Sequence, residues 1–81
     1  PSLSPFEIEK TVTLPIETAL AGIPGLEYTR SISRNGFAQV TVVFRDSVDI
    51  YFARTQVSQR LSQAKDQLPA NAEPIMGPVS T

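Results

Sequence analysis

The sequence predicts a single α+β domain in which two helices pack on one face of a mainly antiparallel sheet. Two stretches carry apolar residues at three- and four-residue steps, as amphipathic helices do. Between them lies an Asn35-Gly36 dipeptide flanked by two segments of high β propensity, a pattern typical of a β-hairpin. The chain has 81 residues and no cysteine, so helix-on-sheet packing must supply its stability.

The first predicted helix begins at Ser4, which can cap it, and Glu7 completes a capping box. Pro15 removes the hydrogen bond to the Thr11 carbonyl, which predicts a kink. The helix ends at Gly22. Its apolar face consists of Ile8, Val12, Ile16, Ala19, Leu20 and Ile23.

The hairpin is predicted from strands over residues 26–34 and 37–44, with a two-residue turn whose central positions both need positive φ. This register places Ala38, Val40, Val42 and Phe44 on one face with Ser33, Ser31, Thr29 and Glu27. The other face carries Tyr28, Arg30, Ile32, Thr41 and Val43. Small residues opposite the valines favour a close approach of helices, but the second face is also partly apolar, so which face is buried stays open.

The second predicted helix can be capped by Asp46 or Ser47, and Asp49 lies at its positive end. Tyr51 and Phe52 lie about 100° and 200° from its apolar seam. They predict a second surface to be buried, by a partner outside this chain. The seam consists of Ile50, Ala53, Val57, Leu61, Ala64 and Leu68.

Residues 73–76 predict a last strand, which flanking proline confines to a sheet edge. Adding one strand before the first helix gives the order βαββαβ, which is the ferredoxin-like, split βαβ arrangement. We therefore expect residues 1–81 to form one domain whose first strand is truncated. Both chain ends are abrupt, which fits excision from a larger protein.

The composition excludes several classes of function. Seven basic and eight acidic residues provide no field for nucleic acid or an anionic membrane, and no apolar run approaches the roughly 20 residues that span a bilayer. Without histidine or cysteine, neither nucleophile–base pairs nor the usual zinc sites can form. Met76 fits packing better than a soft-metal site, which needs further sulfur ligands. We expect no enzyme active site, no cofactor and no metal site in this chain.

Several segments together resemble the periplasmic porter region of resistance-nodulation-division (RND) efflux transporters. The resemblance is to the heavy-metal branch, of cobalt-zinc-cadmium and copper-silver exporter type, and in particular to its first porter subdomain. It covers nearly the whole chain in the same order and spacing. The segments are Ser4 to Glu9, Pro15 to Gly25, Arg30 to Arg34, Gln39 to Phe44, Asp49 to Arg54 and Gly77 to Thr81.

The resemblance implies a homotrimer in the inner membrane of a Gram-negative bacterium, with this segment in the periplasm. It implies a proton-driven exporter that takes metal cations as substrate and joins other porter subdomains, a periplasmic adaptor and an outer-membrane channel. The second helix would be a pore helix around the trimer axis, and an ordinary solvated face is the competing interpretation. No metal ligand of the family maps onto this chain. The implied interface residues are Tyr51, Phe52, Thr55, Gln59 and Ser62.

Two alternatives remain from the residues alone. The first is a freestanding ferredoxin-like regulatory module that binds a small ligand between its helices or across a dimer interface. Such a module needs both edge strands intact. The second is a small acylphosphatase-like enzyme, which needs an arginine-bearing phosphate cradle that residues 1–5 do not offer.

Overall fold

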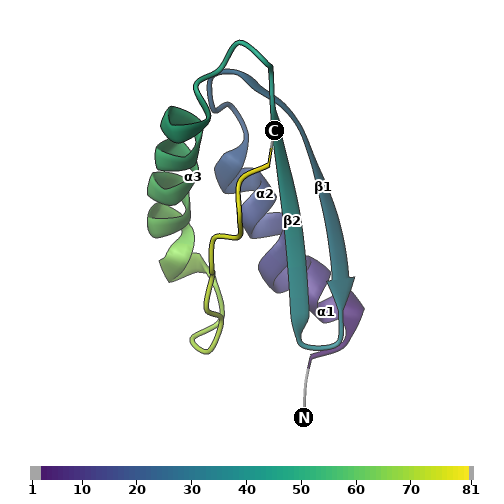
Figure 1. Ribbon diagram of the computed structural model, residues 1–81. Helices are drawn as coiled ribbons and strands as arrows, with labels where there is room; N and C mark the ends of the chain where they lie inside the picture. The colour runs from purple at the N-terminus through teal and green to yellow at the C-terminus, as the bar shows by residue number, and fades with distance from the viewer. Residues whose placement is uncertain (1–2, 81) are drawn as a thin grey trace.

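A computed structural model describes residues 3–80 and confirms the α+β class. A helical segment, Pro5 to Leu20, precedes the hairpin strands β1 (Leu26–Arg34) and β2 (Phe37–Phe44). Helix α3 (Ile50–Ala64) and the 3₁₀ turn η2 (Lys65–Gln67) follow. Both helical segments lie on the same side of the hairpin, in a molecule that measures 42 × 21 × 20 Å (Figure 1).

The predicted capping box is present at the start of α1 (Pro5–Ile8). The Glu7 N–H donates to Ser4 Oγ at 3.2 Å, and the Ser4 N–H donates to Glu7 Oε1 at 2.9 Å. The pKa of Glu7 is held below its ordinary value of 4.5. The hydrogen bond from the Ser4 backbone is the main cause, and the hydrogen bond with the Ser4 side chain is the second. The cap therefore stabilises the helix best when Glu7 is ionised.

A pH dependence of stability follows from this cap. Because the pKa of Glu7 is lower in the folded chain, its contribution is present above its unfolded-state pKa and is lost as the pH falls through the folded-state pKa. Glu7→Gln keeps a hydrogen-bonding side chain but removes the charge. We expect the variant to be less stable than the wild type near neutral pH and the gap to close in acid. Urea denaturation over a pH series checks this, and a gap that widens on acidification would contradict it.

The first helical segment is wound irregularly before Pro15. A π-helical turn, η1 (Glu9–Thr13), separates α1 from α2 (Leu14–Leu20), and the Leu14 N–H donates to the Glu9 carbonyl. Pro15 has no N–H for the Thr11 carbonyl and its ring crowds that group, so a wider turn just before it relieves the clash. The predicted irregularity thus takes the form of a π turn over five residues.

The π turn brings Thr13 into the core, a position that the regular helical period did not predict. Thr13 is fully buried. Its Oγ1 lies 2.9 Å from Ser33 Oγ on β1, and Ser33 donates its single hydroxyl proton to Glu9 Oε1 at 2.9 Å. Thr13 is therefore the donor to Ser33, and its burial leaves no unpaired polar group.

The hairpin has the predicted two-residue turn, with Arg34 paired to Phe37. The prediction that both central residues of the turn have positive φ was wrong. Gly36 has a positive φ, as the third residue of a type II turn does, but Asn35 does not. The Gly36 N–H donates to the Leu3 carbonyl at 2.8 Å, a contact from outside the hairpin. A bulge between Leu26 and Tyr28 also places Leu26, and not the predicted Glu27, opposite Phe44.

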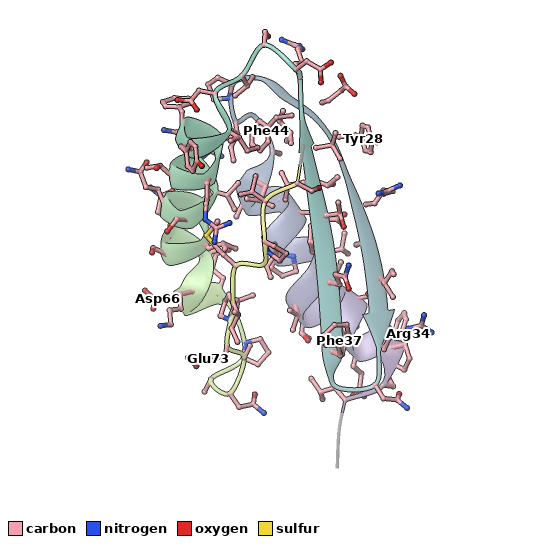
Figure 2. All side chains as sticks on the ribbon, in the orientation of Figure 1. Tyr28, Arg34, Phe37, Phe44, Asp66 and Glu73 are labelled. Atoms are coloured by element: carbon pink, nitrogen blue, oxygen red, sulfur yellow. The ribbon has the colours of Figure 1, made fainter. Side chains whose placement is uncertain are left out.

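The face that carries Val40, Val42 and Phe44 is the buried one. These residues and Leu26 pack on a core of Leu20, Ile23 and Val57 from the helical side. In Figure 2, Phe44 points toward the helices and Tyr28 points away from them. The open choice between the two hairpin faces is thereby decided.

Helix α3 is capped by Asp49, whose carboxylate accepts from the Tyr51 N–H at 3.1 Å. The prediction that Asp46 or Ser47 forms the cap was wrong, because those residues lie in the turn before it. The predicted seam faces inward: Ala53, Val57, Ala64 and Leu68 are buried, and Ile50 and Leu61 are partly buried.

The predicted strand over residues 73–76 is not formed. Within residues 3–80 the sheet has two strands only, β1 and β2. A strand needs a neighbour for its ladder of hydrogen bonds, and neither hairpin strand pairs with this segment. Met76 still packs on the core and the Gly77 carbonyl accepts from Arg54 Nη1 at 2.8 Å. The segment is thus held by side chains rather than by sheet pairing.

Candidate functional site

The five predicted interface residues all lie on the exposed side of α3. Tyr51 is 74% exposed, and Phe52, Thr55, Gln59 and Ser62 are exposed as well. Positions 51, 55, 59 and 62 fall within a band of about 80° at 3.6 residues per turn. They form one stripe along the helix, and Phe52 flanks it near the N-terminal end. Ser58 lies about 20° outside this band, on the side away from Phe52, and is exposed as well; it was not among the predicted residues.

The stripe, defined as Tyr51, Thr55, Ser58, Gln59 and Ser62, carries no charge. Helix α3 has only two charged residues, Arg54 and Arg60, and both side chains donate to backbone carbonyls. Within residues 3–80, the one hydrogen bond made by a side chain of the stripe runs from Thr55 Oγ1 to the Tyr51 carbonyl at 3.0 Å. The other side chains of the stripe are therefore free for an external contact.

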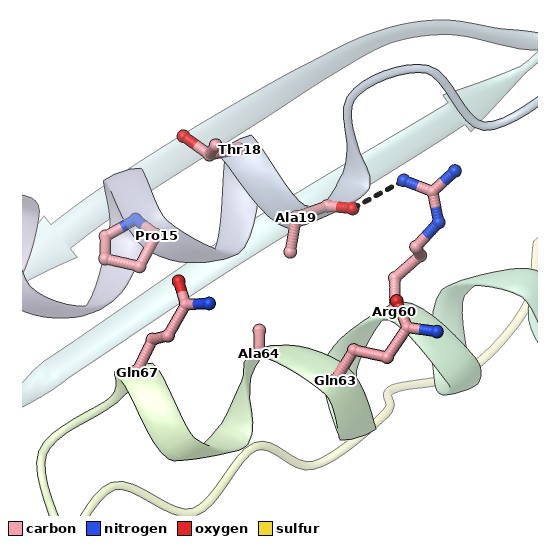
Figure 3. A pocket seen from close by; sticks show the side chains of 7 residues that line it. All are labelled: Pro15, Thr18, Ala19, Arg60, Gln63, Ala64 and Gln67. Carbon is pink, nitrogen blue, oxygen red and sulfur yellow. Dashed lines mark hydrogen bonds between the residues drawn. The ribbon is translucent and has the colours of Figure 1, made fainter.

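Arg60 connects the two helical segments at the end of α2. Its Nη1 donates to the carbonyls of Ala19 at 2.8 Å and Ala21 at 2.9 Å. Figure 3 shows the guanidinium reaching across from α3 to the Ala19 carbonyl. These carbonyls have no partner further along the helix, so the arginine satisfies them and places a cation at the negative end of α2. Sequence reasoning missed this contact, because no local pattern links residues 41 positions apart.

A hollow of about 240 Å³ lies beside this contact, between α2 and α3 (Figure 3). Alanines and amide side chains dominate its lining, and it contains no carboxylate. Arg60 closes one end, but its Nη1 is already used by the two carbonyls. The lining residues are Pro15, Thr18, Ala19, Arg60, Gln63, Ala64 and Gln67.

The described part of the chain has neither a candidate metal site nor a candidate membrane-spanning helix. Among residues 3–80, no cluster of three or more carboxylates, histidines or cysteines could hold a metal ion. No helix in the same range is long and apolar enough to cross a bilayer. The exposed stripe of α3 is therefore the candidate site.

Comparison with known proteins identifies the family. A family model described as the AcrB/AcrD/AcrF family matches residues 1–81, the whole chain. The chain belongs to this family. It is 64% identical over 81 residues to the nickel and cobalt resistance protein CnrA of Cupriavidus metallidurans and 57% identical to the cobalt-zinc-cadmium resistance protein CzcA of that organism. It is 36% identical over 81 residues to the cation efflux system protein CusA of Escherichia coli.

Membership in the AcrB/AcrD/AcrF family confirms the predicted resemblance to heavy-metal RND transporters. The family is one of transporters and not of enzymes. Each of these three alignments covers the whole chain but only 8% of the relative. The role of this part within the larger protein is therefore a separate question.

Proposed function

We propose that residues 1–81 form the first periplasmic porter subdomain of a proton-driven RND exporter of heavy-metal cations. The chain has no catalysis of its own. Its α3 packs with two symmetry mates as the pore helix of a homotrimer in the inner membrane. The whole protein joins a periplasmic adaptor and an outer-membrane channel, and its substrate is a metal cation. The names of its relatives, which specify nickel, cobalt, zinc and cadmium resistance, support this substrate class.

The uncharged stripe of α3 carries the proposal. Around a threefold axis, each residue of a central helix lies near its own copies, so a charged residue there would repel itself. An ordinary solvated helix face carries charged residues, whereas this one runs from Tyr51 to Ser62 without any. Aromatic and small polar side chains suit close contact between identical helices. The two arginines of α3 donate to carbonyls within the subdomain, which holds both guanidinium groups against the subdomain.

We also propose that a strand preceding residue 1 completes a ferredoxin-like sheet. In a split βαβ unit, two parallel strands leave room for an antiparallel strand between them. The chain after Ala72 runs in the same direction as β2 in Figure 1, without pairing to it. The Leu3 carbonyl is bonded to Gly36 at the beginning of β2, so a strand that ends there would run antiparallel to β2. This arrangement supports the predicted truncated first strand.

The freestanding regulatory module is less well supported. Its ligand was expected between the helices, where the hollow of about 240 Å³ is smaller than the roughly 300–1,000 Å³ of typical ligand pockets. No observation on the described residues favours a bound small molecule.

The pore-helix role is tested in the full-length protein with Gln59→Glu and Tyr51→Ala. At a threefold axis, Gln59→Glu introduces three carboxylates close together, and such like-charge contacts cost several kcal/mol. We expect a smaller trimeric fraction, measured by light scattering after size exclusion, and lower metal resistance of the host cell. Tyr51→Ala removes apolar contact area and is expected to have a weaker effect of the same sign.

Gln67→Glu is the matched control, because Gln67 is exposed but lies in η2, outside the stripe. We expect this variant to keep both trimer content and metal resistance. If Gln59→Glu leaves both quantities at the wild-type level, α3 does not line the axis. Loss of both quantities in the control as well would assign the effect to net charge rather than to position.

A further inference from the structure

The hairpin has a second surface that the pore-helix proposal does not use. We define the outer face as the side chains of β1 and β2 that point away from the helices. It is partly aromatic and aliphatic, and Ile32 is 46% exposed at its centre. Figure 2 shows Tyr28 pointing away from the helices. The outer face consists of Tyr28, Arg30, Ile32, Arg34, Phe37, Gln39, Thr41 and Val43.

The outer face is positively charged as well as apolar. Arg30 and Arg34 lie on it, and none of its eight residues is an aspartate or glutamate. A shallow hollow of about 450 Å³ opens between these strands, with Arg30, Ile32 and Thr41 among its lining residues. An arginine beside a hollow can receive a carboxylate in a bidentate contact, while the neighbouring aromatics cover apolar groups.

We infer that the outer face docks a carboxylate-bearing segment of the same polypeptide, from outside residues 1–81. The inference rests on the proposed function, in which this chain is one part of a larger transporter. The 81 residues align with only 8% of the length of these relatives. A transporter of that length has many residues outside 1–81, and one of those segments provides the partner. An acidic side chain enters the hollow next to Arg30, and apolar side chains cover Tyr28 and Phe37.

Two other occupants fit the observations less well. A second copy facing the first would bring two positively charged faces together, and like charges in contact are unfavourable. An anionic lipid surface is the other candidate, but recognition of such a surface usually needs a cluster of about four to eight basic residues. The outer face has two. A covalently linked acidic segment needs no such cluster, because its effective concentration is high.

Photocrosslinking in the full-length protein tests the inference. Benzoylphenylalanine replaces Ile32, and in a control protein it replaces Leu14, which is 48% exposed on the opposite, helical side of the hairpin. We expect the Ile32 probe to crosslink within one polypeptide. Peptide mapping should then find the product in a segment outside residues 1–81 that contains aspartate or glutamate. Arg30→Glu should lower the yield of this product by roughly fivefold or more, because it places like charges in contact.

Lys65→Glu is the charge control, because Lys65 is exposed in η2 and lies outside the hairpin. It should leave the yield unchanged. Any one of three results would overturn the inference: crosslinks between two polypeptides through position 32, crosslinks to lipid only, or a yield at Ile32 no higher than that at Leu14. Trimer content is measured on the same samples, so a docking failure with intact trimers is distinguishable from failure of the pore-helix proposal.

Discussion

Gly25→Ala is expected to destabilise the chain by about 2–5 kcal/mol, from two effects that act at one position. Gly25 has a φ of +83°, where an alanine is strained. A Cβ at this position would also overlap the side chain of Val48. Neither partner can move freely, since the Gly25 carbonyl accepts from the Arg45 N–H at 2.9 Å and valine is stiff at χ1.

Gly22→Ala provides the matched control for this prediction. Gly22 has nearly the same φ, +84°, but a Cβ there would meet no atom within 4 Å. The loss of stability in Gly22→Ala should be limited to the backbone strain of about 1–2 kcal/mol. Urea denaturation of the 81-residue chain measures both variants. Equal losses for the two glycines would show that the contact with Val48 does not constrain the loop.

Leu20→Ala is expected to lower the free energy of unfolding by about 2–5 kcal/mol, a large part of the stability of so small a domain. Leu20 is 1% exposed and packs with Ile23 and Val57 at the centre of the core. Val40 and Val42 of the hairpin close over this cluster. Removal of the leucine methyl groups therefore leaves a cavity between the helices and the sheet.

Leu14→Ala is the corresponding control within the same helix α2. Leu14 is 48% exposed, so the same substitution removes little buried area and should change stability by roughly 0.5 kcal/mol. Thermal and urea unfolding of the two variants give the comparison. A loss at Leu14 as large as that at Leu20 would contradict the burial of Leu20 and the exposure of Leu14 in this structure.

Several features of the fold could be predicted from the sequence because the interacting residues are neighbours in it. The Ser4–Glu7 capping box joins residues three positions apart. The seam of α3 follows from its helical period, and the same period correctly predicted that Tyr51, Thr55 and Gln59 are exposed. The hairpin register follows from a two-residue turn. The family, too, could be identified from short segments along the chain.

Other features could not be predicted because their partners are distant in the sequence. The buried Thr13 depends on Ser33, 20 positions away, and the Arg60 contact spans 41 positions. The Gly36 N–H at the turn donates to the carbonyl of Leu3, 33 positions earlier, and residues 73–76 lack a strand partner within residues 3–80. The contacts of the two arginines of α3 also belong here, since Arg54 binds a carbonyl 23 positions away and Arg60 one 41 positions away.

Local patterns thus determined the two helical segments, the hairpin and which side of α3 stays exposed. They did so because caps, turns and periodicity depend on residues within a few positions of one another. Tertiary packing alone decided which face of the hairpin is buried, that Thr13 joins the core, and where the side chains of Arg54 and Arg60 bind. Those outcomes depend on the docking of α3 against α2 and the hairpin, and no single segment contains the atoms involved.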